Sequence, residues 1–238
     1  MMSARKTAAR PAIVIMSRMP VPGEVKTRMQ PLISPERSAD LQRALLLDTL
    51  DMVGFIKRTT AFLAFAPAER NGISCPHKVP REQVFQQIGR DLGERILESS
   101  KTVLNKGYSP VVIIGSDCPV LQPETIDEAI HSLNSADVCI GPAQDGGYYL
   151  IGMKRTISDI FLDIPWGTSE VFDATTQRAV RSGLNVHLLQ KLFDIDTRSS
   201  LEQLAPILKD PDRSGIRHFP QRTYDWMLKE GFCGDKKS

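Results

Sequence analysis

The sequence predicts a three-layer α/β/α fold built around a mostly parallel central sheet. Short apolar runs alternate with amphipathic helical patterns along nearly the whole chain, an arrangement typical of parallel sheets with helices on both faces. The run at 111–115 is apolar throughout, as expected for a strand buried on both faces. Of the 238 residues, 41% are hydrophobic and 24% charged, which are ordinary values for a chain that buries a full core.

The predicted strands are apolar runs of three to six residues, too short for helices. In chain order they are 12–16, 61–66, 111–115, 138–140, 148–151 and 186–189. In open α/β sheets, ligands bind beyond the carboxyl ends of the strands. The residues that follow each strand are therefore the candidates for chemistry.

The predicted helices show apolar residues at helical spacing. The first begins after Ser34 as N-cap with Pro35 at the first helical position, and carries Leu41, Leu45 and Met52 on one face. The later ones are 91–106, 123–133, 168–181, 199–208 and a short helix around 224–228.

The domain organisation follows from this alternation. Residues 1–10 are basic and polar and are interpreted as a loose tail, with 11–210 as a single catalytic domain. Residues 211–238 are expected to form a C-terminal extension that packs on the domain or is partly disordered. No repeat or low-complexity linker interrupts the chain.

Composition argues against several classes of partner. The formal charge is +2, and no Lys/Arg run interleaves with aromatic residues, which disfavours nucleic acid. No apolar stretch is long enough to span a membrane. The cysteines form no CxxC pair, which disfavours a zinc site or a disulfide framework and favours free thiols in a cytoplasmic protein. They are Cys75, Cys118, Cys139 and Cys233.

Two cations follow the first predicted strand. Lys26 and Arg28 lie in a loop just before a helix, where a phosphate could take charge-assisted hydrogen bonds from both. The alternative is a solvated loop with incidental charges. The loop contains neither GxGxxG nor a complete Walker A sequence, which disfavours the dinucleotide and P-loop folds.

Aspartates follow two other strands. Asp117 comes directly after the strand at 111–115, where a carboxylate is suited to a hard cation such as Mg²⁺ bridging phosphates. Asp194 and Asp196 follow the last strand and point to one side if the segment is extended, so a second carboxylate could complete the metal site. The alternatives are a turn aspartate at 117 and a cap for the helix near Ser199.

Two further segments are candidates for the substrate side. The first consists of Asp145, Gly146 and Gly147, where two glycines would let backbone amides approach a ligand closely. The same residues could form a hairpin turn, and the two interpretations are compatible. Residues 165–169 open a helix with Thr168 or Ser169 as cap, and Trp166 could line a pocket. No nucleophile motif accompanies the histidines, so Ser-His-Asp chemistry has no support.

Taken in order, these motifs are far more specific than any one alone. They read Arg18-x-Pro, Pro22-Gly-x-Val-Lys-Thr-Arg28, Asp91-Leu-Gly-Glu-Arg95, Gly115-Ser-Asp-Cys-Pro119, Gly141-Pro-Ala-x-Asp-Gly-Gly-Tyr-Tyr-Leu150, Pro165-Trp-Gly-Thr168 and Asp194-x-Asp-Thr197. Over about residues 12–208, the chain resembles a bacterial family of uncharacterised glycosyltransferases named for association with radical-SAM and selenocysteine-domain proteins. That family resembles a branch of the nucleotide-diphospho-sugar transferase superfamily with a GT-A type fold. It is similar to the 2-phospholactate guanylyltransferase family.

The resemblance implies roles for particular residues. It implies a metal, Mg²⁺ or Mn²⁺, on Asp117 and Asp196, with Lys26, Arg28 and Asp117 as the catalytic set. It implies nucleotide contacts from Arg18, Lys26, Arg28 and Ser116. It places on the substrate side Asp145, Gly146, Gly147, Tyr148, Trp166 and Thr168. Residues 17–20 replace the glycine-rich loop of many superfamily nucleotidyltransferases, which leaves the base and the use of a triphosphate open.

The predicted function is a metal-dependent transferase with a nucleoside triphosphate or nucleotide-sugar donor and a small phosphorylated or sugar-like acceptor. In nucleotidyl transfer, an acceptor phosphate attacks the α-phosphorus and pyrophosphate leaves. In glycosyl transfer, the acceptor attacks the anomeric carbon and a nucleoside diphosphate leaves. The alternative outside enzymes is a silent nucleotide-sensing or scaffold protein of the same fold, against which the retained Asp117 and Asp196 argue.

Overall fold

A seven-stranded sheet forms the centre of the described part of the chain. The computed structural model describes residues 9–66 and 78–233, so the predicted tail up to residue 8 and Cys75 lie outside it. The strand order is β3-β2-β1-β4-β6-β5-β7. Their bounds are Ala12–Arg18 (β1), Thr60–Ala66 (β2), Val84–Gln86 (β3), Val111–Gly115 (β4), Val138–Pro142 (β5), Tyr148–Met153 (β6) and Val186–Leu188 (β7). All neighbours are parallel except β6, which runs antiparallel to β4 and β5, so the mostly parallel sheet is confirmed.

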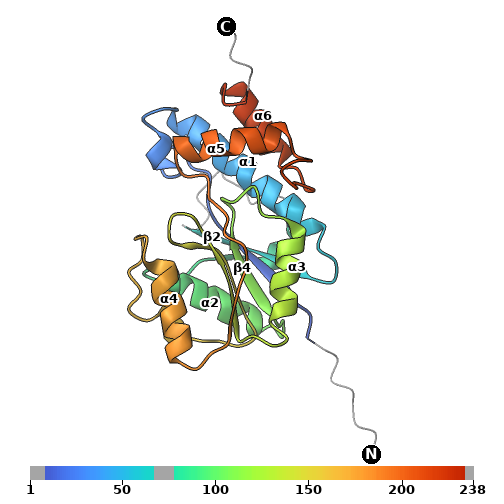
Figure 1. Ribbon diagram of the computed structural model, residues 1–238, viewed down its shortest axis with the longest axis vertical. Coiled ribbons are helices and arrows are strands. Elements are labelled where there is room, and N and C mark those ends of the chain that lie inside the picture. The colour runs from blue at the N-terminus through green and yellow to red at the C-terminus, as the bar shows by residue number, and fades with distance from the viewer. Residues whose placement is uncertain (1–8, 67–77, 234–238) are drawn as a thin grey trace, which may run out of the picture.

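Helices cover both faces of this sheet, which confirms the three-layer α/β/α architecture (Figure 1). They are Pro35–Gly54 (α1), Leu92–Leu104 (α2), Pro123–Ser132 (α3), Val171–Arg181 (α4), Arg198–Lys209 (α5) and Gln221–Lys229 (α6). One buried cluster joins the sheet to α1, α3, α5 and α6, and a second joins the other face to α2 and α4. Alternate side chains of β1 enter different clusters, Ile13 and Ile15 the first, Val14 the second.

The predicted N-terminus of α4 was wrong. The helix begins at Val171 with Glu170 as N-cap, and no side chain caps it. Thr168 instead closes a turn before the helix, because its Oγ1 donates to the Pro165 carbonyl at 2.8 Å and accepts from the Glu170 N–H at 3.2 Å. Gly167, at φ +83°, supplies the left-handed residue of this turn. The three-residue strand β3 was also missed, since so short a run has no readable period.

An aspartate of α1 caps the C-terminal helix α6 from outside. Pro220, the N-cap residue of α6, provides no side-chain cap. Asp48 is 5% exposed, and its two oxygens accept from the N–H groups of Arg222 at 3.1 Å and Thr223 at 2.8 Å. The Arg222 guanidinium also pairs with Asp48 and Asp51. The start of α6 is therefore fixed to α1 by charge-assisted hydrogen bonds.

Replacing Asp48 by alanine should lower the free energy of unfolding by about 1–3 kcal/mol, because it leaves buried N–H groups of α6 without an acceptor. Urea denaturation measures the change. Asp40→Ala is the matched control, since Asp40 is on the same helix but its ion pair with Arg43 is half exposed. Equal losses in the two variants would contradict the capping role of Asp48.

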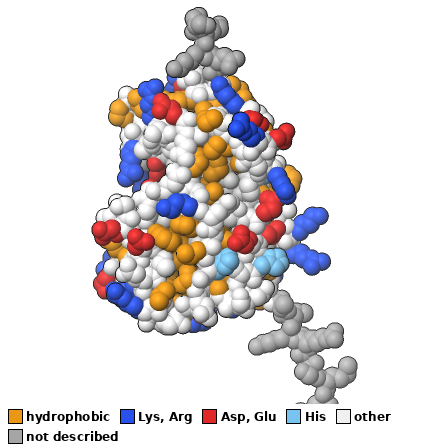
Figure 2. Space-filling model, in the orientation of Figure 1, with side chains coloured by type: hydrophobic (Ala, Val, Ile, Leu, Met, Phe, Trp, Pro, Cys, Tyr) orange, Lys and Arg blue, Asp and Glu red, His pale blue; other side chains and the backbone are white. Residues whose placement is uncertain are grey.

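The surface carries both signs of charge. On the face shown in Figure 2, Lys and Arg side chains are interspersed with Asp and Glu, and no large patch of one sign gathers there. None of the described helices is both long enough and apolar enough to cross a membrane.

Candidate functional site

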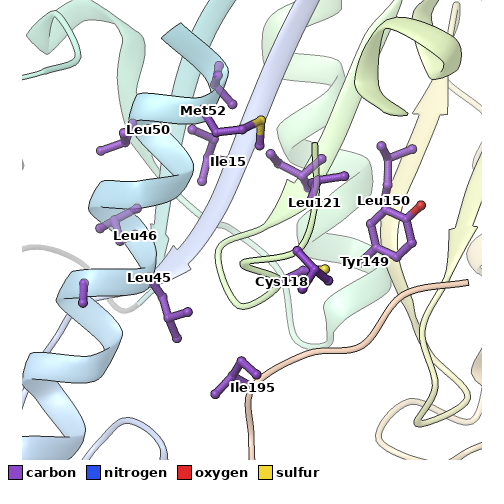
Figure 3. Close-up of a cluster of buried hydrophobic side chains, with 14 of the residues drawn as sticks. Ile15, Leu45, Leu46, Leu50, Met52, Cys118, Leu121, Tyr149, Leu150 and Ile195 are labelled. Carbon is purple, nitrogen blue, oxygen red and sulfur yellow. The ribbon is translucent and has the colours of Figure 1, made fainter. Parts of the chain in front are cut away.

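The strand ends bring the segments of Asp117 and Asp196 together. Asp117 follows β4, and the segment with Asp196 follows β7 after an isolated bridge to the end of β5. The Ile195 N–H donates to the Asp117 carbonyl at 2.8 Å, which ties the two segments side by side. Cys118 and Ile195 bury their side chains in the core beneath (Figure 3). The aspartates next to these buried residues therefore face the cavity above the sheet.

Lys26 joins the two aspartates. Its ammonium Nζ lies 3.0 Å from Asp117 Oδ1 and 3.0 Å from Asp196 Oδ1. The Lys26 side chain is 2% exposed, whereas those of Asp117 and Asp196 are 35% and 43% exposed. The carboxylates are thus open to the cavity from above while the ammonium is enclosed beneath them.

The backbone of Lys26 is held in a conformation that a lysine rarely adopts. Its φ of 47° and ψ of 39° are left-handed, which costs a residue with a Cβ about 1–3 kcal/mol. The short helix Thr27–Met29 follows directly, and the buried side chains of Val25 and Met29 fix the loop on both sides. The strain is therefore offset by packing that directs the Lys26 side chain at the carboxylates.

Charge and burial shift the pKa values of this cluster. Burial disfavours the charged Lys26 ammonium, but Asp117 and Asp196 outweigh it and raise the Lys26 pKa. Lys26 in turn holds the pKa of Asp196 below its usual range, assisted by Arg28 and Arg18. The Lys26–Asp196 pair is therefore charged at neutral pH.

Asp194 lines the same cavity, on the other side of Ile195 from Asp196. Burial, with the neighbouring Asp117 and Asp196 charges, raises its pKa to about 7. The sequence offers Asp194 and Asp196 together as candidates for the second carboxylate, and the resemblance assigns the metal to Asp196. The position of Asp194 adds a further carboxyl group to the cavity wall, beside those of Asp117, Asp145 and Asp196.

Gln42 of α1 supports the site and was missed from the sequence. It is 2% exposed, and its Nε2 lies within hydrogen-bond distance of Asp117 Oδ1, Ser116 Oγ and Ser17 Oγ, at 3.3, 3.1 and 3.3 Å. The Ser116 hydroxyl donates to Ser17 at 3.0 Å. A polar residue on the otherwise apolar face of a predicted helix was the available signal. Ser116, predicted to touch the nucleotide, belongs to this buried support.

A cavity of about 660 Å³ collects most of the predicted site residues, a size typical of small-molecule sites. Those lining it are Arg18, Lys26, Arg28, Asp117, Asp145, Gly147, Tyr148, Trp166, Thr168 and Asp196. Two adjoining cavities of about 550 and 400 Å³ also include Arg18 in their walls. Ser116 lines the smaller of these instead.

Gly146 does not line the large cavity but packs the turn between β5 and β6 against the segment before α4. At φ +90°, a Cβ on Gly146 would lie 2.0 Å from the Ser169 carbonyl oxygen. Its own carbonyl accepts from the Phe172 N–H at 2.8 Å. Asp145 closes the turn by accepting from the Gly147 N–H at 2.9 Å. The segment is therefore both a hairpin turn and a cavity wall.

An aromatic pair forms another part of the cavity wall. The rings of Tyr148 and Trp166 meet edge to face with centroids 6.4 Å apart. Gly93 of α2 lies directly against the Trp166 indole, since a Cβ there would be 2.3 Å from Cζ2. This contact explains the glycine in the Asp-Leu-Gly-Glu-Arg motif.

Gly93→Ala should therefore displace Trp166 and lower the free energy of unfolding by about 1–3 kcal/mol. The result is informative because alanine favours a helix over glycine by up to about 1 kcal/mol, so only the clash gives a loss. Indole emission in a Trp226→Phe background and urea unfolding measure both effects. Gly54→Ala at the end of α1, where a Cβ meets nothing within 4 Å, is the control and should be neutral or stabilising.

The donor set fits a hard divalent cation whose remaining ligands come from a substrate. Asp117 and Asp196 offer carboxylate oxygens to the cavity, and Mg²⁺ is commonly held by one or two carboxylates together with phosphate oxygens and water. Within the described residues, no group of three or more His, Cys, Asp or Glu side chains could enclose a metal by itself. The arrangement therefore suits a cation shared with a nucleotide rather than a closed structural site.

Comparisons with known proteins show which family and which proteins this chain is similar to. Residues 49–168 match the family described as "Uncharacterized protein conserved in bacteria (DUF2064)". The chain is 22% identical over 196 residues to a 2-phospho-L-lactate guanylyltransferase of Methanothermobacter thermautotrophicus, covering 81% of this chain and 82% of that one. It is 22% identical over 214 residues to the enzyme of that name from Archaeoglobus fulgidus, covering 87% and 85%.

A solved structure also matches over almost the whole chain. It is a candidate nucleotide-diphospho-sugar transferase from Desulfovibrio desulfuricans G20, with a TM-score of 0.81 and 29% identity over 93% of this chain and 96% of that one. The family resemblance inferred from the motifs is thereby confirmed.

Proposed function

The chain belongs to the DUF2064 family, and we propose that it is a metal-dependent nucleotidyltransferase that moves a nucleoside monophosphate from a triphosphate to a small acceptor. It is a transferase of the nucleotide-dependent class; the metal, the donor and the type of transfer are the proposal. The observation that carries it is the Lys26–Asp117–Asp196 cluster, which lies in a 660 Å³ cavity that Arg18 and Arg28 also line. The guanylyltransferase name of two relatives supports this type of transfer.

The acidic and basic residues of the cavity have different roles in the proposed reaction. A divalent cation held by Asp117 and Asp196 would supply neutralisation of the phosphate oxygens. Arg18, Lys26 and Arg28 bind and orient the triphosphate by charge-assisted hydrogen bonds. An acceptor oxygen forms a bond to the α-phosphorus as the bond between the α-phosphorus and the oxygen that bridges it to the β-phosphate breaks. Pyrophosphate leaves, and these cations stabilise its negative charge. Such catalysis is positioning and electrostatics, so it needs no protein nucleophile.

Glycosyl transfer is the second candidate. The cavity is also lined by Tyr148, Trp166 and Asp145, and aromatic faces with carboxylate acceptors suit hydroxylated rings. The name of the Desulfovibrio structure also favours it. In this reaction the same cations would stabilise a departing nucleoside diphosphate.

One experiment separates the candidates. The protein is incubated with each nucleoside triphosphate and each common nucleotide-sugar, with Mg²⁺ or Mn²⁺, while thermal shift and pyrophosphate release are followed. Stabilisation by a triphosphate together with pyrophosphate release is expected. Stabilisation by nucleotide-sugars alone, without pyrophosphate, would point to glycosyl transfer instead. If no nucleotide stabilises the protein with either metal, both enzyme hypotheses are wrong. Nucleotide binding without turnover of any donor would favour a catalytically silent nucleotide-sensing protein.

A cytoplasmic setting is part of the same proposal. The described cysteines Cys118, Cys139 and Cys233 are free and buried, and free thiols suit a reducing compartment.

A further inference from the structure

Lys26 lies where a metal-binding pair would hold its cation. Its Nζ is 3.0 Å from one oxygen of Asp117 and 3.0 Å from one oxygen of Asp196, the two residues assigned to the metal. With a side chain only 2% exposed, the ammonium has exchanged water for these carboxylates. The two aspartates are therefore already neutralised in part by the chain itself.

We propose that Lys26 is the resident counter-ion of this site, and that a divalent cation enters only together with a nucleotide whose phosphates accept the displaced Lys26 ammonium. This inference rests on the proposed function, because it concerns the order in which that site fills. It makes Lys26 a residue that couples metal binding to nucleotide binding.

The coupling follows from competition for the same oxygens. A divalent cation bound to Asp117 and Asp196 would share them with the ammonium, and two cations a few ångströms apart in a partly dry site repel each other strongly. Without a nucleotide, the displaced ammonium would give up both carboxylate contacts at 3.0 Å and would need another anion as its partner in a buried position. A triphosphate supplies that anion, so metal and nucleotide each favour the binding of the other, as reciprocal linkage requires.

The backbone of the loop around Lys26 is fixed, so only the Lys26 side chain is expected to move. The Lys26 carbonyl accepts from the Met29 N–H at 2.9 Å, and Val25 and Met29 are each 1% exposed. Gln30 donates from Nε2 to the Val25 carbonyl at 3.2 Å. The backbone on both sides is therefore anchored, and the four-carbon side chain is the part that can redirect its charge from carboxylate to phosphate.

The test measures Mn²⁺ binding by the full chain, using the electron paramagnetic resonance signal of free Mn²⁺. Lys26→Met should bind Mn²⁺ without nucleotide about tenfold or more tighter than the wild type, because the competing ammonium is gone. Lys57→Met is the control, since Lys57 is exposed before β2, at the opposite edge of the sheet, and should match the wild type. Adding the stabilising triphosphate should tighten Mn²⁺ binding in the wild type far more than in Lys26→Met.

Equal Mn²⁺ affinities of Lys26→Met and wild type without nucleotide would overturn the inference, as would wild-type affinity unaffected by nucleotide. Lys26→Gln removes the charge but keeps a polar side chain, and provides the same comparison if the methionine variant does not fold. Mn²⁺ should also raise the melting temperature of either Lys26 variant more than that of the wild type. A different result would contradict the proposed function, namely that the wild type binds no nucleotide with either metal.

Discussion

Asp117→Asn is expected to abolish metal-dependent nucleotide binding and to lower pyrophosphate release by about 10²–10³-fold, the loss seen when one electrostatic contact to a transition state is removed. The amide keeps the shape of the carboxylate but removes the charge that a hard cation requires. Asp117 is also 35% exposed to the cavity, so the substitution leaves the core beneath it unchanged. Calorimetric titration with the metal and the triphosphate measures binding, and a coupled pyrophosphate assay measures turnover.

The fold of this variant should survive. Gln42 and Lys26 donate to the Asp117 carboxylate, and an asparagine oxygen can accept from both in its place. Asp127→Asn on the exposed face of α3 is the matched control and should behave as the wild type. Asp196→Asn should share the binding defect. Unchanged nucleotide binding in Asp117→Asn would remove Asp117 from the mechanism.

Much of this site could be predicted because parallel strands end at one edge of a sheet. Lys26, Asp117 and Asp196 are far apart in the chain, yet each follows β1, β4 or β7, and those strands are recognisable as short apolar runs. A carboxylate at such a strand end is informative because nothing in the strand pattern requires it. Convergence of the three residues was therefore accessible from order and spacing alone.

The direct contact between Lys26 and both aspartates was not accessible. It depends on a left-handed backbone at Lys26 and on the burial of Val25 and Met29, and a non-periodic loop gives no sign of either. From sequence, Lys26 could only be assigned to phosphate. The structure shows that its charge is already used within the protein, which changes what metal binding must displace.

Hydrogen-bond partners that the periodic pattern of the sequence does not show account for most of the remaining differences. Asp48 caps α6 from α1, and Thr168 closes a turn rather than capping α4. Both residues are of types that commonly cap helices, but Asp48 caps a helix that is distant in the chain, whereas Thr168 bonds to Pro165 and Glu170 within its own turn. The antiparallel direction of β6 follows from the tight turn at Asp145. This turn is the predicted hairpin turn, and it also forms part of the cavity wall.

That turn gives the second large expected effect. Gly146→Ala should lower the free energy of unfolding by about 3 kcal/mol or more, because it combines a left-handed backbone with a backbone clash. The φ is +90°, and the added Cβ would lie 2.0 Å from the Ser169 carbonyl oxygen, which is main chain and cannot rotate away as a side chain would. Relief requires the turn and the segment before α4 to separate, and the Phe172 N–H then loses its Gly146 acceptor.

Gly147→Ala isolates this effect from the loss of a glycine as such. Gly147 is the next residue in the same turn, but its φ is not positive and its Cβ would approach only the Asp145 carboxylate, at 3.2 Å. The Gly147 N–H that donates to Asp145 is kept in alanine. Urea unfolding should therefore show a loss below about 1 kcal/mol for Gly147→Ala, within the range of ordinary surface changes.

Since the separated segment carries Trp166 and Thr168 into the cavity wall, Gly146→Ala should also reduce transfer more than Gly147→Ala in the pyrophosphate assay. Equal stability of the two alanine variants would show that the turn and the segment before α4 are not packed as described.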